Sequence, residues 1–234
     1  GKVWVEAWAP CFTFHGFQYV EVSGLPASYT PAHPPPLDTV VGLALGSDTP
    51  RAGHLETSDP QTNALLSNIY WTQRANFLAL PTDCPQRDER LGWTGDAQMY
   101  CGTAALLADV APFLAKWAVQ DLGDAQADYG QFPMFAPLAQ LGRILHQAYS
   151  TSQDGGPGWA DAGVIVPWAL WAQYGDARAL GRCYPGMARF ARFCVGRCGP
   201  KLTPPDTFHC FGDWLNIDDD TPKPLIFSAY LAHS

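Results

Sequence analysis

The spacing of apolar side chains changes once along the chain and divides the sequence into two parts. Residues 12–22 alternate between apolar and polar side chains and are rich in aromatic and β-branched types, which is typical of a β-strand. A similar alternation opens the chain at residues 3–8, and a proline-rich stretch at 26–36 leads into a further apolar run at 39–45. Residues 2–48 therefore predict the strands at the end of a β-domain.

Beyond residue 53 the apolar positions recur at helical spacing. Asp59 and Pro60 supply a capping side chain and a proline for the first turn of a helix. The pattern predicts helices at residues 59–79, 96–119, 138–149, 161–174, 176–198 and 224–234, with Gly-, Pro- and Asp-rich loops between them. Antiparallel helix pairs joined by long loops suit an α/α toroid, in which the loops at one end build a concave site. We therefore expect a mainly α fold.

Both ends of the sequence interrupt a pattern. The chain opens inside an alternating segment, and the last helical pattern reaches Ser234 without Gly or another C-cap. About six predicted helices are roughly half of a closed twelve-helix ring. We expect an excerpt truncated at both ends, in which residues 1–50 end a β-domain with its linker and residues 51–234 form the first half of an α/α barrel.

Composition narrows the classes of partner. The net charge is −8, and the 14 Lys and Arg form no basic stripe, so nucleic acid is excluded as a partner. No apolar stretch approaches the ~20 residues that cross a bilayer, and no signal peptide is visible, which predicts a soluble chain without a membrane partner. Both a cytoplasmic and an exported location stay open, and so does the oligomeric state.

The cysteine pattern and the absence of cofactor motifs limit the kinds of cofactor, metal and disulfide chemistry that we expect. No cofactor motif is present, and the seven cysteines are odd in number and lack CxxC spacing, so we expect mostly reduced, buried thiols. They are Cys11, Cys84, Cys101, Cys183, Cys194, Cys198 and Cys210.

The loop at residues 81–96 concentrates four carboxylates, two guanidinium groups and a tryptophan in a chain with only 15% charged residues. One interpretation is a solvated loop with internal salt bridges, with Asp96 capping the next helix. The other is a carbohydrate site, which needs carboxylates for sugar hydroxyls, an Arg to keep them ionised and an aromatic face for the sugar ring. Hydrolysis also needs a carboxyl group that keeps its proton, and Asp83, Asp88 and Asp96 around Glu89 supply the negative charge that favours it.

The segment from Asp83 to Asp96 reads Asp-Cys-Pro-Gln-Arg-Asp-Glu-Arg-Leu-Gly-Trp-Thr-Gly-Asp, and it resembles the signature of α-L-rhamnosidases of glycoside hydrolase family 78. Fourteen positions with so many Cys, Trp, Arg and acidic identities make a specific match. The resemblance continues in the family's order through residues 14–21, 158–163, 211–215 and 221–223. It therefore covers nearly the whole chain.

The resemblance implies an enzyme that removes terminal α-L-rhamnose from rhamnose-containing glycosides or oligosaccharides with inversion, using no cofactor and no metal. It implies an (α/α)6 barrel preceded by β-sandwich domains, so that this chain would hold a partial (α/α)6 toroid after strands from the end of a β-sandwich domain. Glu89 would be the general acid. The rhamnose ring would be held by Asp83, Arg87, Trp93 and Asp96, with Trp159 and Trp214 as aromatic walls.

Other conspicuous residues receive plainer interpretations. Tryptophans beside Gly in loops, such as Trp159 and Trp214, often fill a core instead of binding a ligand. His15 lacks metal-ligand partners at useful spacing and is assigned no role. The run at residues 218–220 lacks the alternating ligands of a calcium loop, and its position before Thr221 predicts a helix cap.

The sequence departs from a complete inverting hydrolase in one respect. That reaction needs a second carboxylate ~6.5 to 9.5 Å from the acid to activate water, and no acidic residue follows Asp220. We expect the general base beyond Ser234 and an inactive fragment. The segment at 138–153 is also longer than the family's usual connection. The alternatives are a rhamnose-binding relative without hydrolysis and another α/α-toroid glycosidase, such as a glucosidase.

Overall fold

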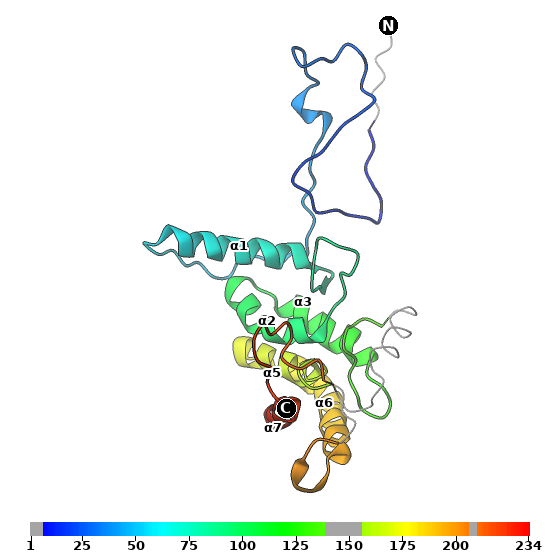
Figure 1. Ribbon diagram of the computed structural model, residues 1–234, viewed down its shortest axis with the longest axis vertical. Helices are drawn as coiled ribbons and strands as arrows, with labels where there is room; N and C mark the ends of the chain where they lie inside the picture. Colours follow the sequence, from blue (N-terminus) through cyan, green and yellow to red (C-terminus); the bar gives the residue numbers. More distant parts are fainter. Residues whose placement is uncertain (1–6, 139–155, 206–209) are drawn as a thin grey trace.

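The computed structural model describes residues 7–138, 156–205 and 210–234, and it is mainly helical (Figure 1). The described part holds six α-helices, which are α1 (Pro60–Asn76), α2 (Thr94–Leu107), α3 (Ala111–Lys116), α5 (Ala162–Tyr174), α6 (Ala177–Arg197) and α7 (Lys223–His233). A π-helical segment, η2 (Trp117–Leu122), continues α3, and two 3-10 turns, η1 (Leu37–Thr39) and η3 (Pro200–Leu202), lie in loops. Two-residue strands, β1 (Phe77–Leu78) and β2 (Leu80–Pro81), pair antiparallel directly after α1, with Phe77 opposite Pro81.

Aspartate side chains start two of the helices. Both carboxylate oxygens of Asp59 accept backbone N–H bonds at 3.1 Å, from Gln61 and Thr62, and the predicted Pro60 opens α1. Asp176 caps α6 in the same way, with its carboxylate accepting the N–H of Arg178 at 2.9 Å. These bonds satisfy N–H groups that the first helical turn leaves without partners. The predicted cap of the first helix is therefore confirmed.

The predicted helix at 96–119 is interrupted, which corrects the sequence interpretation. Ala108 is extended, with φ −147° and ψ 158°, and it bridges to Arg51. Pro112 stands in the first turn of α3, where a missing N–H is tolerated, whereas in the middle of one long helix it would remove a hydrogen bond. The apolar periodicity runs through this break and so conceals it. The helix predicted at 138–149 lies outside the described residues.

The strands predicted in the N-terminal part are not formed in residues 7–48. The one bridge there joins Thr30 to His33, and large side chains such as Trp8, Phe12 and Tyr19 are exposed. Alternation favours extended backbone, but a strand also needs a neighbour for its ladder hydrogen bonds, and the described residues offer none. Figure 1 shows this segment extending away from the helical body.

The core lies where α2, α5 and α6 pack together beside α3 and η2. Trp117 is fully buried there, and its indole N–H donates to the Ala136 carbonyl at 3.1 Å. Gly175 ends α5 in the left-handed conformation, with φ 68°, which lets the chain reverse directly into α6. The loops that precede α2, α5 and α7 carry the residues singled out from the sequence.

Residues 218–220 do not cap the last helix, so that prediction is wrong. The N-cap of α7 is Pro222, and no side chain accepts a bond from the first turn. The side chain of Asn216 instead accepts the N–H groups of Asp218 and Asp219 and donates to Asp220, which closes a local turn. The run of acids lies in that turn.

The cysteines carry no disulfide bond in the structure. All seven cysteines are free thiols, and four of them are buried. In the parts of the chain that the structure describes, no helix combines the length and apolar character needed to cross a membrane.

Candidate active site

The loop between β2 and α2 is closed on itself by its own backbone and by Asp83. The N–H of Asp83 donates to the Leu91 carbonyl at 3.0 Å, and the N–H of Leu91 donates to the Asp83 carboxylate at 2.9 Å. The next residue, Gly92, lies so close to Ala136 that a Cβ there would come 2.1 Å from its carbonyl oxygen. Asp83 and Leu91 thus fix both ends of the acidic segment, and Gly92 seats it on the helical body.

Glu89 lies at the centre of the polar contacts. Its Oε2 accepts two bonds from the Arg87 guanidinium group, from Nε at 2.9 Å and from Nη2 at 2.7 Å, and its Oε1 accepts the Trp93 indole N–H at 3.0 Å. The Glu89 side chain is 35% exposed. The same guanidinium nitrogen, Nη2, lies 3.6 Å from the Asp83 carboxylate, whose side chain is only 8% exposed. Arg87 therefore bridges two carboxylates, and the bond to Glu89 is the main cause that raises the pKa of Arg87.

Asp96 lies in the first turn of α2 and does not cap it, because Trp93 occupies the N-cap position. The residue as a whole is exposed, yet its carboxyl group lies against enough protein for desolvation to raise its pKa. The negative charges of Asp83 and Glu89 raise that pKa further. Three carboxyl groups thus share one small region with a single paired guanidinium group.

Aromatic rings extend the site from this loop to the loops before α5 and α7. The Phe211 ring contacts all three candidate tryptophans edge to face, with centroids 6.2 Å from Trp93, 4.8 Å from Trp159 and 5.7 Å from Trp214. Trp159 and Trp214 also meet directly at 6.3 Å, and Phe135 packs on Trp93 at 5.3 Å. Such edge-to-face contacts orient the rings as well as burying their area.

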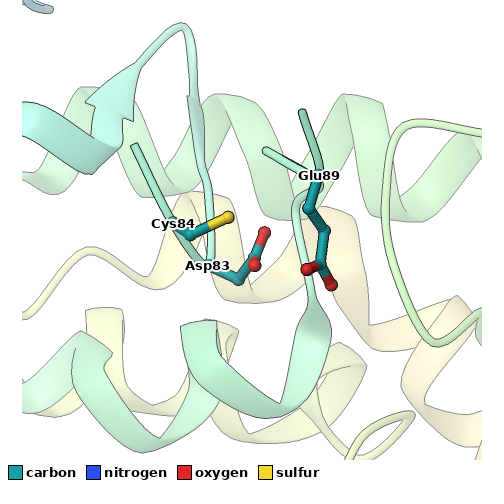
Figure 2. A group of neighbouring side chains, drawn as sticks. All are labelled: Asp83, Cys84 and Glu89. Carbon is teal, nitrogen blue, oxygen red and sulfur yellow. The ribbon is translucent and has the colours of Figure 1, made fainter. Parts of the chain in front are cut away.

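Figure 2 shows Asp83, Cys84 and Glu89, a group of neighbouring side chains in the loop that could hold a metal ion. One ligand atom of each lies within 4.8 Å of the others. Both carboxylates are already paired with Arg87, and the negative charge of Asp83 adds to burial in favouring the protonated Cys84 thiol. Burial is the main cause that raises the pKa of this thiol, and a metal would have to displace its proton. The arrangement suits a hydrogen-bonded carboxylate cluster better than a cation site.

Six of the seven residues predicted from the sequence are connected by contacts, and the seventh, Asp96, feels the charge of two of them. Asp83, Arg87, Glu89 and Trp93 are joined by hydrogen bonds and ion pairs, Asp96 is coupled to them by charge, and Phe211 links Trp93 to Trp159 and Trp214. Trp214 is 63% exposed, so it does not fill a core.

Sequence reasoning missed two of the rings. In the sequence Phe211 belongs to the segment at 211–215, and its spacing of three residues before Trp214 is the one signal that suggests a role. Phe135 carries no local signal. His15, which was assigned no role, is exposed.

Two protein-family models match this chain. Residues 50–234 match the model of the bacterial alpha-L-rhamnosidase 6 hairpin glycosidase domain, and residues 1–42 match that of the bacterial alpha-L-rhamnosidase concanavalin-like domain. An alpha-L-rhamnosidase of Streptomyces avermitilis is 44% identical over 98% of this chain, and one of Formosa agariphila is 38% identical over 97%. The chain spans 20% and 23% of the lengths of these relatives.

Two solved structures extend the comparison to three dimensions. The native alpha-L-rhamnosidase of Aspergillus terreus superposes with a TM-score of 0.82 at 34% identity, over 97% of this chain and 26% of its own. The Streptomyces avermitilis alpha-L-rhamnosidase complexed with L-rhamnose superposes with a TM-score of 0.70 at 43% identity, over 80% of this chain and 17% of its own.

Proposed function

This chain belongs to the bacterial α-L-rhamnosidase family, and we propose that it carries the general acid of an inverting glycosidase that removes terminal α-L-rhamnose from glycosides and oligosaccharides. In this proposal residues 1–50 end a β-sandwich domain, and residues 51–234 form the first half of an (α/α)6 catalytic barrel. Glu89 donates a proton to the glycosidic oxygen. Asp83, Arg87, Trp93 and Asp96 hold the sugar ring, and Trp159 and Trp214 form its aromatic walls.

The observation that carries the proposal is the position of the Glu89 carboxyl group. It lies between a charged group, Arg87, and the edge of an aromatic cluster that begins at Trp93. A sugar seated on those rings would bring its glycosidic oxygen toward a carboxyl group while its hydroxyl groups meet Asp83 and Asp96. Aromatic faces beside paired carboxyl groups are what a pyranose ring and an oxocarbenium-like transition state require.

Proton donation requires a change in the contacts of Glu89. Both of its oxygens accept bonds from N–H donors, whereas a protonated carboxyl group donates from one oxygen. Protonation therefore weakens the bonds that Glu89 accepts from Arg87 and Trp93. The neighbouring carboxylates of Asp83 and Asp96 are natural alternative partners for the Arg87 guanidinium group or for sugar hydroxyls.

A second carboxylate must activate the water in single displacement. We propose that it comes from a part of the full-length protein outside this chain, which spans only 20% and 23% of the lengths of the two relatives. A relative that binds rhamnose without hydrolysing it would lack that base and would keep the contacts described above. Assay of the full-length protein for release of rhamnose separates the two.

The test of Glu89 compares two leaving groups in the full-length protein. Glu89→Gln should lower kcat/KM on a rhamnoside with a poorly acidic alcohol by about 10² to 10⁴ fold, the usual worth of positioned proton transfer. An activated aryl rhamnoside should lose far less, because its leaving group needs little protonation.

Asp96→Asn is the control for this test. It should depress the two substrates alike, because contacts to ring hydroxyls do not depend on the leaving group. Equal losses on both substrates for Glu89→Gln would mean that Glu89 holds the sugar and that another carboxyl group donates the proton.

A further inference from the structure

Arg90 connects the acidic loop to the N-terminal segment. Its Nη1 donates to the Phe14 carbonyl at 3.1 Å, and the guanidinium carbon lies 4.4 Å from the centroid of the Phe14 ring. A Cβ at Gly16 would lie 3.9 Å from the Pro85 carbonyl oxygen, so the two segments touch at a second point. Phe14 and Arg90 are both partly buried. Residues far apart in sequence are thus clamped together at the loop that carries Glu89.

The same guanidinium group also holds the loop from within. Its Nε donates to the Arg87 carbonyl at 3.1 Å, so one planar side chain bonds the backbone of Arg87 and that of Phe14 together. Such a fork with fixed donor directions is a property of Arg that Lys lacks. Arg87 in turn places its own guanidinium group on Glu89 at 2.7 Å. The chain of contacts runs from Phe14 through Arg90 and Arg87 to Glu89.

The backbone of Arg90 indicates that the side-chain contacts determine its conformation. Its φ is +46°, in the left-handed region that residues other than Gly, Asn and Asp seldom adopt. Strained backbone of this kind persists where the surrounding contacts fix it, and it is found where a site needs one defined geometry. Here the contacts that fix it are the two carbonyl groups and the Phe14 ring.

We propose that Arg90 is a positioning residue that uses the N-terminal segment at Phe14 as an anchor to aim Arg87, and through it Glu89, at the substrate. The catalytic part of this inference rests on the proposed function, whereas the anchoring part does not. It assigns a role in the active site to a segment outside the helical body. It also predicts that loss of the Phe14 contact loosens a loop to which Phe14 is not adjacent in sequence.

The first measurement is hydrogen exchange on peptides that cover residues 83–93 in the full-length protein. Arg90→Ala should raise exchange there, and Phe14→Leu should raise it less, because Leu keeps the backbone carbonyl and loses only the ring. Arg90→Gly accepts the left-handed backbone without strain, so it should match Arg90→Ala if the side chain is what matters.

Arg74→Ala is the matched control for the exchange experiment. It removes a comparable cation–π pair, in which the Arg74 guanidinium carbon lies 5.6 Å from the Trp71 ring on α1. Exchange at 83–93 should be unchanged in this variant. Unchanged exchange in both Arg90 variants would overturn the proposal.

The second measurement separates positioning from a loss of folded protein. Arg90→Ala should lower kcat/KM on a rhamnoside with a poorly acidic leaving group by on the order of 10- to 100-fold, and on an activated aryl rhamnoside by much less, because a misplaced acid matters most where proton transfer is needed. Millimolar guanidinium chloride should restore part of the loss. Equal losses on both substrates without rescue would contradict positioning. If the wild-type protein hydrolyses neither substrate, the proposed function fails, and the exchange measurement still decides whether Arg90 anchors the loop.

Discussion

Cys84 illustrates how the environment of one side chain sets its chemistry. The residue is 4% exposed, and burial, followed by its hydrogen bond to Asp83, raises the pKa of the thiol. Cys11 is exposed. Because the thiolate is the reactive form, alkylation of the native full-length protein near neutral pH should modify Cys11 well before Cys84.

Peptide mass spectrometry of the alkylated protein measures this order. Asp83→Asn should speed the modification of Cys84, since it removes a negative charge and weakens the hydrogen bond that closes the loop. The rate of modification at Cys11 should stay unchanged. Modification of Cys84 as fast as Cys11 in the wild-type protein would show that the thiol is neither covered nor held by Asp83.

Single residues divide into those that the sequence could identify and those that it could not. The motif identifies Asp83, Arg87 and Glu89 because their spacing within one loop is a local property. Phe135 and Arg90 act through partners far away in sequence, at Trp93 and at Phe14, so no local pattern marks them. The roles of the motif residues stay predictions until the variants are measured.

At the scale of elements, two glycines of helix α2 differ in the space around them. A Cβ at Gly95 would lie 2.6 Å from the indole nitrogen of Trp159, whereas a Cβ at Gly102 would meet nothing within 4 Å. Ala is favoured over Gly inside a helix by ~1 kcal/mol, but forcing extra volume into a packed contact costs about 1 to 3 kcal/mol. Gly102→Ala should therefore stabilise the protein, and Gly95→Ala should destabilise it and displace Trp159.

Denaturant unfolding of the two variants measures the first effect, and tryptophan fluorescence with titration of L-rhamnose measures the second. Gly95→Ala should weaken rhamnose binding, and Gly102→Ala should not. A stabilised Gly95→Ala variant with unchanged binding would mean that Trp159 yields without loss.

The helices were predictable from sequence to the extent that their determinants are local. Asp59, Asp176 and Gly175 mark helix ends by side chain or by backbone freedom, and α5, α6 and α7 begin and end within a residue or so of the prediction. The break at Ala108 was missed because apolar spacing continues through it. The strands expected at 7–48 depend on partners beyond the segment itself, and alternation alone does not supply them.

For the molecule as a whole, Asp161 connects the start of α5 to the end of α7. Its carboxylate accepts the Gly158 N–H at 2.8 Å and the Ser234 hydroxyl at 2.9 Å, and burial raises its pKa to about 6. In the unfolded chain this group titrates near 3.8. The folded protein therefore binds more protons between these two pH values, so Asp161 contributes stability at low pH that is lost as pH rises through about 6.

A pKa difference of this size corresponds to about 3 kcal/mol of pH-dependent stability. Asp161→Asn keeps an acceptor for the Gly158 N–H, offers an amide N–H to the Ser234 hydroxyl oxygen in place of the bond it accepted, and cannot ionise, so it should lose this dependence. The free energy of unfolding, measured by denaturant in wild type and variant at about pH 4 and pH 7, should favour the variant at the higher pH. Parallel pH profiles for the two proteins would contradict a raised pKa of Asp161.

The two hydrogen bonds between Asp83 and Leu91 affect the conformational entropy that the loop would lose when a ligand binds. Fixing one backbone residue in a single conformation costs about 1 to 2 kcal/mol, so ordering a free loop of this length during binding would consume much of the attraction for a single sugar. One backbone bond and one bond to the Asp83 carboxylate join the ends of the acidic segment, and Gly92 lies against Ala136, so this ordering already takes place when the protein folds. Under the proposed function, the interactions with the sugar can then act on the glycosidic bond that breaks, which is where binding energy accelerates a reaction.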